Sequence, residues 1–326
     1  MKRGIALAVV VVLAILALVV PLPVFVLAPG SAISVGDRVE LGRPPDPLSG
    51  EFLLTTVRLF QPSVAGIVQA WLSDTREVLS REEVVPPGVN DVEFEEAQRA
   101  LFRESSEVAA AVGLRAAGAD VTVTGAGAEV AAVRPGSPAD GALRPGDVIT
   151  GVDGEAVKLA SDLVAALGSR AAGDEVTLVV RRDGVERDVS VRLGTIEGID
   201  QPALGVGITT VDLDVSLPFP VEVDQGRIGG PSAGLLIALT VYDLADPVDL
   251  AAGRSIAGTG TIDLDGEVGP VGGVDAKVVA AREAGASVFL VPEDELALAR
   301  ETAGDDLEVI PVATLDEAIA ALGEAA

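Results

Sequence analysis

Residues 229–234 read Gly-Gly-Pro-Ser-Ala-Gly, between a short strand-like run and an unbroken apolar run. This order predicts a turn that leads into a helix, with Ser232 in the first helical turn. The N–H groups and the positive dipole end of a helix N-terminus can stabilise a developing oxyanion. We therefore expect the backbone around Gly230, Pro231 and Ala233 to support Ser232 if this serine is a nucleophile.

A serine nucleophile needs a neighbouring base to accept its proton. The chain contains no histidine and no cysteine, which excludes a Ser-His-Asp triad and thiol chemistry and makes a zinc site improbable. Lysine is the remaining well-attested base, and Lys277 follows Ser232 in the same half of the chain. Its pKa, normally about 10.4, must fall by roughly 2–3 units for it to act near pH 7–8. Flanking valines and a position just after Asp275, the predicted N-cap of a helix, would lower this pKa.

Composition limits the classes of partner. The 326 residues suffice for two ordinary domains with a substantial core. The formal net charge is −27, from 50 acidic and 23 basic residues, which argues against binding to nucleic acid. No cofactor and no metal are expected, and protein or peptide substrates are the partners we consider.

The N-terminus predicts a membrane segment. Residues 5–20 are all apolar, and the apolar character continues to Ala28, which is long enough to cross a hydrocarbon core of ~30 Å. Two basic residues in the tail 1–4 precede it, so the positive-inside rule keeps this tail in the cytoplasm. We expect one transmembrane helix over residues 5–28 and the bulk of the chain outside the cell. A cleaved signal peptide is the alternative, although its apolar region is usually shorter.

Residues 29–113 carry no evident chemistry. Residues 51–60 predict a strand, and 64–72 and 91–112 predict helices, the second with Asp91 as its candidate N-cap. Trp71 is expected to be a packing residue. We expect this segment to pack against the C-terminal part of the chain, which would make the region between them an insertion.

Residues 114–194 contain a second set of motifs. Pro-Gly-Ser-Pro-Ala begins at Pro135, Leu-Arg-Pro-Gly-Asp-Val-Ile begins at Leu143, and a hairpin turn is predicted at Asp183-Gly184. This series resembles the PDZ modules of bacterial envelope proteases. The resemblance implies a mostly-β domain that binds an extended peptide by strand addition beside a helix.

The resemblance places the peptide groove between the strand around residues 128–133 and the helix 161–167. The implied peptide-binding residues are Gly125, Gly127, Ala128 and Val130. The loop Gly125-Ala126-Gly127 departs from the usual Gly-Leu-Gly-Phe type of carboxylate-binding loop. A spacer with an unoccupied groove is the alternative for this module.

Residues 195–326 alternate predicted helices with short apolar strands, as in an α/β or α+β domain. The stretch at 229–234 and the stretch 258–285, GTGTIDLDGEVGPVGGVDAKVVAAREAG, together resemble the proteolytic domain of Lon proteases, family S16. The resemblance implies that Ser232 is the nucleophile and Lys277 its dyad partner. It also implies that Thr259 hydrogen-bonds near the lysine.

The expected fold is therefore an α/β (α+β) Lon-type proteolytic domain plus a mostly-β PDZ domain, preceded by one transmembrane helix. The whole chain resembles the membrane-anchored, PDZ-containing Lon-like serine proteases of Gram-positive, actinobacterial type. This implies an ATP-independent endopeptidase acting on exported proteins, since no G-x-x-x-x-G-K-[ST] motif occurs. A homohexamer is expected from the resemblance alone. A catalytically silent peptide-binding scaffold and a protein that only cleaves itself remain as alternatives.

Overall fold

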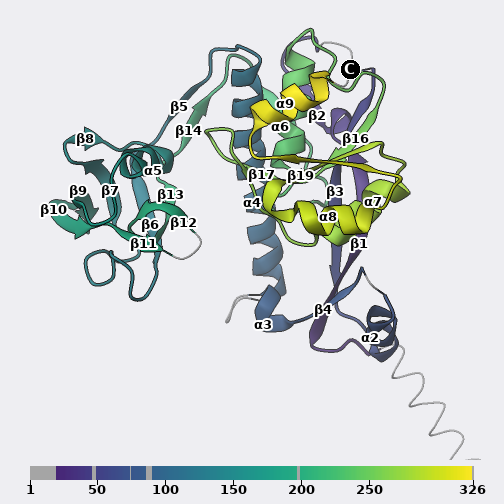
Figure 1. Ribbon diagram of the computed structural model, residues 1–326, viewed down its shortest axis with the longest axis horizontal. Coiled ribbons are helices and arrows are strands. Elements are labelled where there is room, and N and C mark those ends of the chain that lie inside the picture. Colours follow the sequence, from purple (N-terminus) through teal and green to yellow (C-terminus); the bar gives the residue numbers. More distant parts are fainter. Residues whose placement is uncertain (1–19, 46–48, 74, 86–89, 197–198, 325–326) are drawn as a thin grey trace, which may run out of the picture. The chain divides into compact units, whose positions relative to one another are not determined.

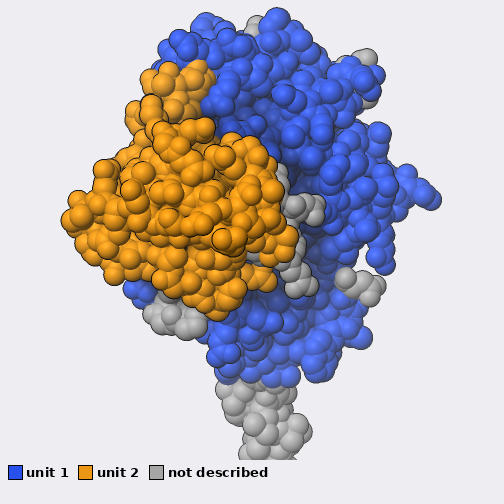
Figure 2. Space-filling model, turned by 60° about the vertical axis from the view of Figure 1, so that its left-hand side comes forward, with its two compact units in different colours: residues 1–120, 217–326 blue, residues 121–216 orange. Residues whose placement is uncertain are grey.

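The computed structural model describes residues 20–45, 49–73, 75–85, 90–196 and 199–324. The chain divides into two compact units, coloured separately in Figure 2. Unit 1 comprises Met1–Asp120 and Leu217–Ala326, and unit 2 comprises Val121–Ser216. Unit 2 is therefore an insertion in the sequence of unit 1, and the N-terminal segment shares a unit with the C-terminal segment.

The strands and helices of unit 1 come from both of its segments (Figure 1). The strands are β1 (Val24–Ser34), β2 (Val39–Leu41), β3 (Glu51–Phe60), β4 (Glu77–Ser80), β15 (Val221–Val223), β16 (Ser255–Gly258), β17 (Thr261–Ile262), β18 (Val268–Gly269), β19 (Val288–Pro292) and β20 (Glu308–Val312). The helices are α2 (Val64–Trp71), α3 (Arg81–Val84), α4 (Asp91–Ala116), α6 (Gly234–Ala245), α7 (Val274–Glu283), α8 (Leu296–Ala303) and α9 (Leu315–Glu324), with 3-10 turns η1 (Gly36–Arg38) and η2 (Glu293–Glu295).

The main sheet of unit 1 has the strand order β20-β19-β16-β3-β1-β4. Strands β3, β16, β19 and β20 are parallel, whereas β1 runs antiparallel to β3 and β4 antiparallel to β1. Strands β2 and β15 form one separate pair, and β17 and β18 form another. Strand β3 from the N-terminal segment thus pairs directly with β16 from the C-terminal segment, which joins the two segments into one sheet.

Helices cover both faces of this sheet, as a mostly parallel sheet requires. Leu53, Ala257 and Phe289 pack in one apolar cluster with residues of α7 and α8. On the other face the backbone of β16 approaches α6, where a Cβ on Gly258 would lie 3.0 Å from the Leu236 side chain. Helix α4 crosses α6 so closely that a side chain at Gly113 would clash with an α6 carbonyl oxygen. The start of α6, which directly follows the turn with the candidate nucleophile, is therefore held between the sheet and α4.

The expected membrane helix over residues 5–28 is wrong at its C-terminal end. Residues 24–28 belong to β1, where Val26 and Ala28 alternate into the core. Pro21 and Pro23 explain the change, because neither residue can donate a helical hydrogen bond. Residues 1–19 lie outside the described part of the chain, and within the described part no helix is both long and apolar enough to cross a bilayer.

Three expectations for the segment after β3 also need correction. Trp71 is not a packing residue, because its side chain is 77% exposed at the end of α2. Helix α4 is capped by Asn90, whose side chain accepts the N–H groups of Val92 and Glu93, and not by Asp91. The helix also runs four residues beyond its expected end at 112.

Unit 2 is a mostly-β domain. Its strands are β5 (Thr122–Thr124), β6 (Ala128–Val133), β7 (Val148–Val152), β8 (Glu155–Ala156), β9 (Glu175–Arg182), β10 (Val185–Arg192), β11 (Gly194–Ile196), β12 (Ile199–Ala203), β13 (Val206–Thr210) and β14 (Asp214–Ser216), with helix α5 (Ala160–Gly168). The main sheet has the order β10-β9-β7-β6-β13. The compact unit extends past the expected PDZ boundary at residue 194, because β13 and β14 pair back onto β6 and β5.

Candidate active site

Ser232 lies in a tight turn just before α6. The helix begins at Gly234 with Ala233 as its N-cap, so the expectation that Ser232 lies in the first helical turn is wrong by two residues. Gly230 adopts a φ of +83°, a left-handed conformation that favours glycine. The Ser232 carbonyl oxygen accepts a 3.0 Å hydrogen bond from the N–H of Gly260. These constraints fix the backbone on both sides of the serine.

Helix α4 fastens the same turn from outside. The Gln98 carbonyl oxygen accepts a 2.9 Å hydrogen bond from the Gly230 N–H. The Ser105 hydroxyl donates a 3.0 Å hydrogen bond to the Pro231 carbonyl oxygen. Neither α4 residue stands out in the sequence, because nothing in the local pattern of α4 indicates that it contacts residues more than 120 positions away.

The hydrogen bonds change the expected set of oxyanion donors. The Gly230 N–H already donates to the Gln98 carbonyl oxygen, and Pro231 has no N–H, so neither residue can donate to an oxyanion. The N–H groups of Ser232 and Ala233 have no acceptor among the described residues. Of the expected donors around the serine, these two remain available.

Lys277 lies in the first turn of α7, which begins at Val274 after an N-cap at Gly273 rather than at Asp275. Its side chain is 3% exposed, and its Nζ donates a 3.0 Å hydrogen bond to Oγ1 of Thr259. Thr259 is itself fully buried, and its hydroxyl donates to the Ser232 carbonyl oxygen over 3.1 Å. The sequence-predicted residues Ser232, Thr259 and Lys277 therefore meet at the carboxyl end of β16.

The direction of these hydrogen bonds matters for proton transfer. Because the Thr259 proton points to the Ser232 carbonyl, Thr259 can only accept from Lys277. The lone pair of a neutral Lys277 amine is then not occupied by Thr259. That lone pair remains available to a hydroxyl proton.

Burial lowers the pKa of Lys277 from its ordinary 10.5 to about 8. The carboxylate that opposes this shift is Glu295, which favours the charged amine. One oxygen of Glu295 accepts a 2.8 Å hydrogen bond from the Val271 N–H, in the loop before α7. The other oxygen is buried with no hydrogen-bond partner among the described residues. Glu295 thus influences both the lysine and the loop beside it.

Ser232 and Lys277 line one cavity of about 950 Å³ within unit 1. Its apolar wall includes Leu27, Ile33, Leu54, Val57 and Val271, and its other charged residues are Arg38, Arg58 and Arg227. Among the described residues no carboxylate lines it, although acidic residues outnumber basic ones in the chain. The size and mixed lining are typical of ligand-binding cavities. No cluster of three metal-ligating side chains occurs among the residues that the structure describes.

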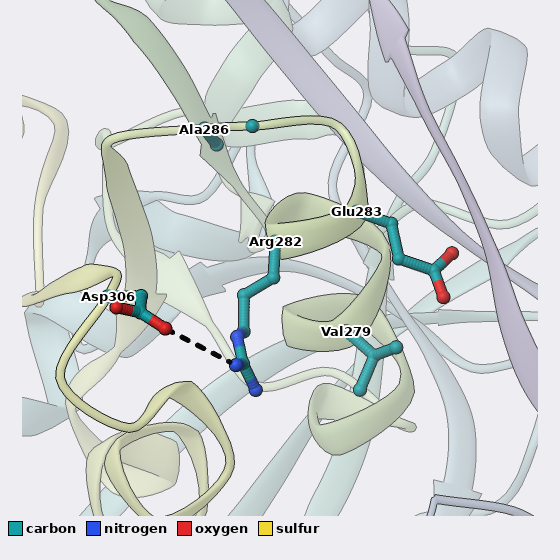
Figure 3. Close-up of a pocket in the computed structure, with 6 residues that line it drawn as sticks. Val279, Arg282, Glu283, Ala286 and Asp306 are labelled. Atoms are coloured by element: carbon teal, nitrogen blue, oxygen red, sulfur yellow. Dashed lines mark ion pairs between the residues drawn. The ribbon is translucent and has the colours of Figure 1, made fainter.

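A second cavity, of about 570 Å³, lies at the C-terminal end of α7 (Figure 3). Figure 3 shows Arg282 extending toward Asp306, with 3.8 Å between Nη2 and Oδ2, while Val279 and Glu283 come from the same helix. This cavity contains neither Ser232 nor Lys277. The candidate nucleophile and the candidate base therefore lie in the first cavity and not in this one.

The expected peptide groove of unit 2 is wrong. Strand β6 pairs with β7 on one edge and with β13 on the other, so neither edge can accept a peptide. Ala128 and Val130 are fully buried in the core of the unit, and Gly127 bonds to Lys158 and Val211. Hence Gly125, Gly127, Ala128 and Val130 do not line an open groove.

Strand β13 is the outer strand of this sheet, and within the described residues only β6 pairs with it. It lies beside α5, where the Ala160 N–H donates a 2.9 Å hydrogen bond to the Thr210 hydroxyl. The residues before and into β13 are Ala203-Leu204-Gly205-Val206, which keep the central Leu-Gly of the Gly-Leu-Gly-Phe type. Residues 203–206 could be compared with this loop type only once the fold had shown that β13 is the edge strand.

Comparisons with known proteins agree with both parts of the chain. The family model for the Lon protease (S16) C-terminal proteolytic domain matches residues 219–323, and the PDZ domain model matches residues 115–193. Lon protease 2 of Bacillus subtilis is 31% identical over 134 residues, which cover 41% of this chain and 23% of that protein. Lon protease of Rhizobium meliloti is 35% identical over 135 residues, covering 38% and 16%.

The chain thus contains a PDZ domain and a Lon-type proteolytic domain, and the matches support a serine peptidase. It spans about a quarter or less of the length of the curated relatives it matches. Among solved structures, the PDZ domain of an SdrC-like protein from Listeria monocytogenes is 26% identical and covers 26% of this chain and 87% of its own, with a TM-score of 0.24.

Proposed function

We propose that this protein is an ATP-independent serine endopeptidase in which Ser232 is the nucleophile and Lys277 the general base. The observation that carries the proposal is the buried Lys277 amine, with a pKa of about 8, joined through Thr259 to the backbone of Ser232. A serine and a partly neutral amine in one cavity supply the two parts that nucleophilic catalysis needs.

In the acylation step, the Ser232 hydroxyl attacks the carbonyl carbon of a peptide bond while neutral Lys277 takes its proton. This step requires Oγ and Nζ to approach within about 2.6–3.2 Å in the substrate complex. The oxyanion that forms accepts hydrogen bonds from the N–H groups of Ser232 and Ala233. Lys277 then gives its proton to the leaving amine, the C–N bond breaks, and an ester on Ser232 remains.

In the deacylation step, Lys277 is neutral again and takes a proton from water. The resulting hydroxide attacks the ester carbonyl, and the proton returns from Lys277 to Ser232 as the acid product leaves. Thr259 holds Lys277 in place throughout, and its bond to the Ser232 carbonyl ties the base to the nucleophile turn. No nucleotide-driven step enters this scheme.

For unit 2 we propose peptide recognition by strand addition to the outer edge of β13. The free strand edge, the neighbouring helix α5 and the Leu204-Gly205 loop support this role. A fluorescent peptide with a free C-terminal carboxylate should bind more tightly than its amide, if the N–H groups of that loop receive the carboxylate. Equal binding of the two forms would restrict the site to internal segments.

We further propose that residues 5–20 anchor the chain in a membrane, with both units outside the cytoplasm and exported proteins as substrates. The sixteen consecutive apolar residues, one fewer than the shortest usual spanning helix of about 17, and the two preceding basic residues support this arrangement. Assembly into a homohexamer is proposed from the resemblance to Lon proteases. Light scattering on the purified full chain tests it.

The proposed serine endopeptidase activity is tested by incubating the full chain with casein and, separately, with a serine-reactive phosphonate, followed by intact mass measurement. Wild type should turn over casein repeatedly and gain one phosphonate adduct. Ser232→Ala should lose both, whereas Ser190→Ala, an exposed serine in unit 2, should lose neither. Adduct formation without casein turnover would favour self-processing, and no adduct would favour a silent scaffold.

A further inference from the structure

Exposed apolar side chains gather in unit 1 around α2 and the C-terminal end of β3, near residue 20, where the described chain begins. Thirteen large hydrophobic side chains are exposed among the described residues; one, Val20, ends the run 5–20, and six of the others fall in this one region. These six residues, which we call the apolar patch, are Leu59, Phe60, Val64, Val68, Trp71 and Leu72. Scattered apolar residues are normal on a protein surface, but a contiguous group marks a contact surface.

Helix α2 supplies most of the patch. Val64, Val68, Trp71 and Leu72 are spaced at i, i+4, i+7 and i+8, which places them on one stripe of the helix and its C-terminal cap. Ala70, on the opposite side, is buried in a small cluster with residues of β1. A helix with this composition is expected to be covered on all sides, yet the stripe is open, with Trp71 and Leu72 77% and 83% exposed.

The patch adjoins the apolar N-terminal run. The Leu22 N–H donates a 2.8 Å hydrogen bond to the carbonyl oxygen of Pro62, immediately before Ser63 caps α2. Residues 5–20 end two positions before Leu22, so the end of the run lies within about 7 Å of this junction. Figure 1 shows α2 beside β4 at this end of the unit. The headgroup layer on each side of a bilayer is about 5–8 Å thick, which matches that reach.

We propose that the apolar patch is a membrane-contact surface, with α2 lying in the headgroup layer of the bilayer that holds residues 5–20. Tryptophan favours this layer because its ring is apolar while its N–H can stay hydrated. The contact is apolar and not electrostatic, because the acidic chain gains nothing from anionic lipid. It places the Ser232–Lys277 cavity, lined by residues 54–58 of β3, within about 20 Å of the bilayer.

The inference rests on the proposed membrane anchor, so the experiment measures both separately. The full chain is reconstituted in phosphatidylcholine vesicles, and flotation in alkaline carbonate reports the anchor. Trp71 is the only tryptophan in the chain, so intrinsic fluorescence reports the patch alone. We expect brominated phosphatidylcholine to quench about half of this emission or more, and aqueous acrylamide to quench it weakly, since an interfacial ring is partly shielded from water.

In a matched control, the single tryptophan is moved to an exposed position near the N-terminal end of β3, far from the patch. Val248 is also exposed, and its neighbour Asp249 hydrogen-bonds Ser49 just before β3 begins, about 30 Å from the patch. In Trp71→Phe/Val248→Trp, brominated lipid should not quench, and acrylamide should. Leu72→Glu in the otherwise unchanged chain should raise the acrylamide quenching of Trp71 in vesicles.

The outcomes separate the claims. Vesicles that float with the chain while Trp71 is open to acrylamide and insensitive to brominated lipid overturn the contact surface and leave the anchor intact. Protection from acrylamide without quenching by brominated lipid also overturns it, and indicates that protein, such as a second copy, covers the patch. Failure to float overturns both the anchor and the contact. None of these three results bears on casein cleavage, which tests the proposed peptidase activity separately.

Discussion

The pKa of Lys277 makes the pH dependence of cleavage a direct test of the mechanism. With a pKa of about 8, about 9% of the amine is neutral at pH 7, about 50% at pH 8 and about 90% at pH 9. Since only the neutral amine can take the Ser232 proton, kcat/KM should rise about tenfold from pH 7 to pH 9 and then level off. At its ordinary pKa of 10.5, less than about 0.1% of the lysine would be neutral at pH 7.

Glu295→Gln sharpens the prediction. Its carboxylate raises the pKa of Lys277 against the effect of burial, so removing the charge should lower that pKa further. The midpoint of the profile should move to lower pH, and activity at pH 7 should rise by at most about tenfold, because no more than all of the amine can be neutral. Glutamine keeps an oxygen that can accept the Val271 N–H, so the loop before α7 retains its hydrogen bond.

The assay is cleavage of a quenched fluorescent peptide that has no group titrating between pH 6 and pH 10. Glu301→Gln, an exposed glutamate on α8, removes the same charge without moving the profile. A flat wild-type profile from pH 6 to pH 9 would refute Lys277 as the base. An unchanged midpoint in Glu295→Gln would refute the assignment of Glu295 as the opposing charge.

Substitutions at three positions test the base, the threonine that it contacts and the turn before the nucleophile. Lys277→Met should abolish turnover. The pKa of Lys277 is lower in the folded than in the unfolded protein, so the wild-type protein loses folding stability as the pH falls from about 10.5 to about 8. At pH 7 the variant should therefore be more stable than wild type by up to about 3 kcal/mol, seen as a higher melting temperature. Thr259→Val should cut kcat by about 10- to 100-fold by releasing the amine, whereas Thr259→Ser, which keeps the hydroxyl, should retain most activity. Gly230→Ala should destabilise the fold by about 1 kcal/mol or more, measured by urea unfolding, and lower kcat, because a φ of +83° strains an alanine next to the nucleophile turn. An active Lys277→Met, an inactive Thr259→Ser or a fully active Gly230→Ala would each contradict the described geometry.

Local sequence was sufficient where the chemistry is encoded in short motifs. The absence of histidine and cysteine directed attention to a lysine base, and the resemblance of two glycine-rich motifs to Lon proteases indicated Ser232, Thr259 and Lys277. The structure brings these three residues together and lowers the pKa of the lysine, as burial beside valines predicts. The predicted helix starts were less accurate. Asp275 and Asp91 are residue types that favour the N-cap, but the N-caps of α7 and α4 are Gly273 and Asn90.

The sequence by itself determined which residue types could do chemistry and which short motifs contain them, because those depend on composition and local order. Only the tertiary structure decided what surrounds them. It showed that α4 fastens the turn before α6, that β13 covers the strand expected to bind peptide, and that Trp71 faces outward. Each of these depends on contacts between segments far apart in the chain. The sequence around a residue favours a local conformation but does not specify which distant segment will contact it. Strand pairing and helix packing depend on how the whole unit buries its apolar surface.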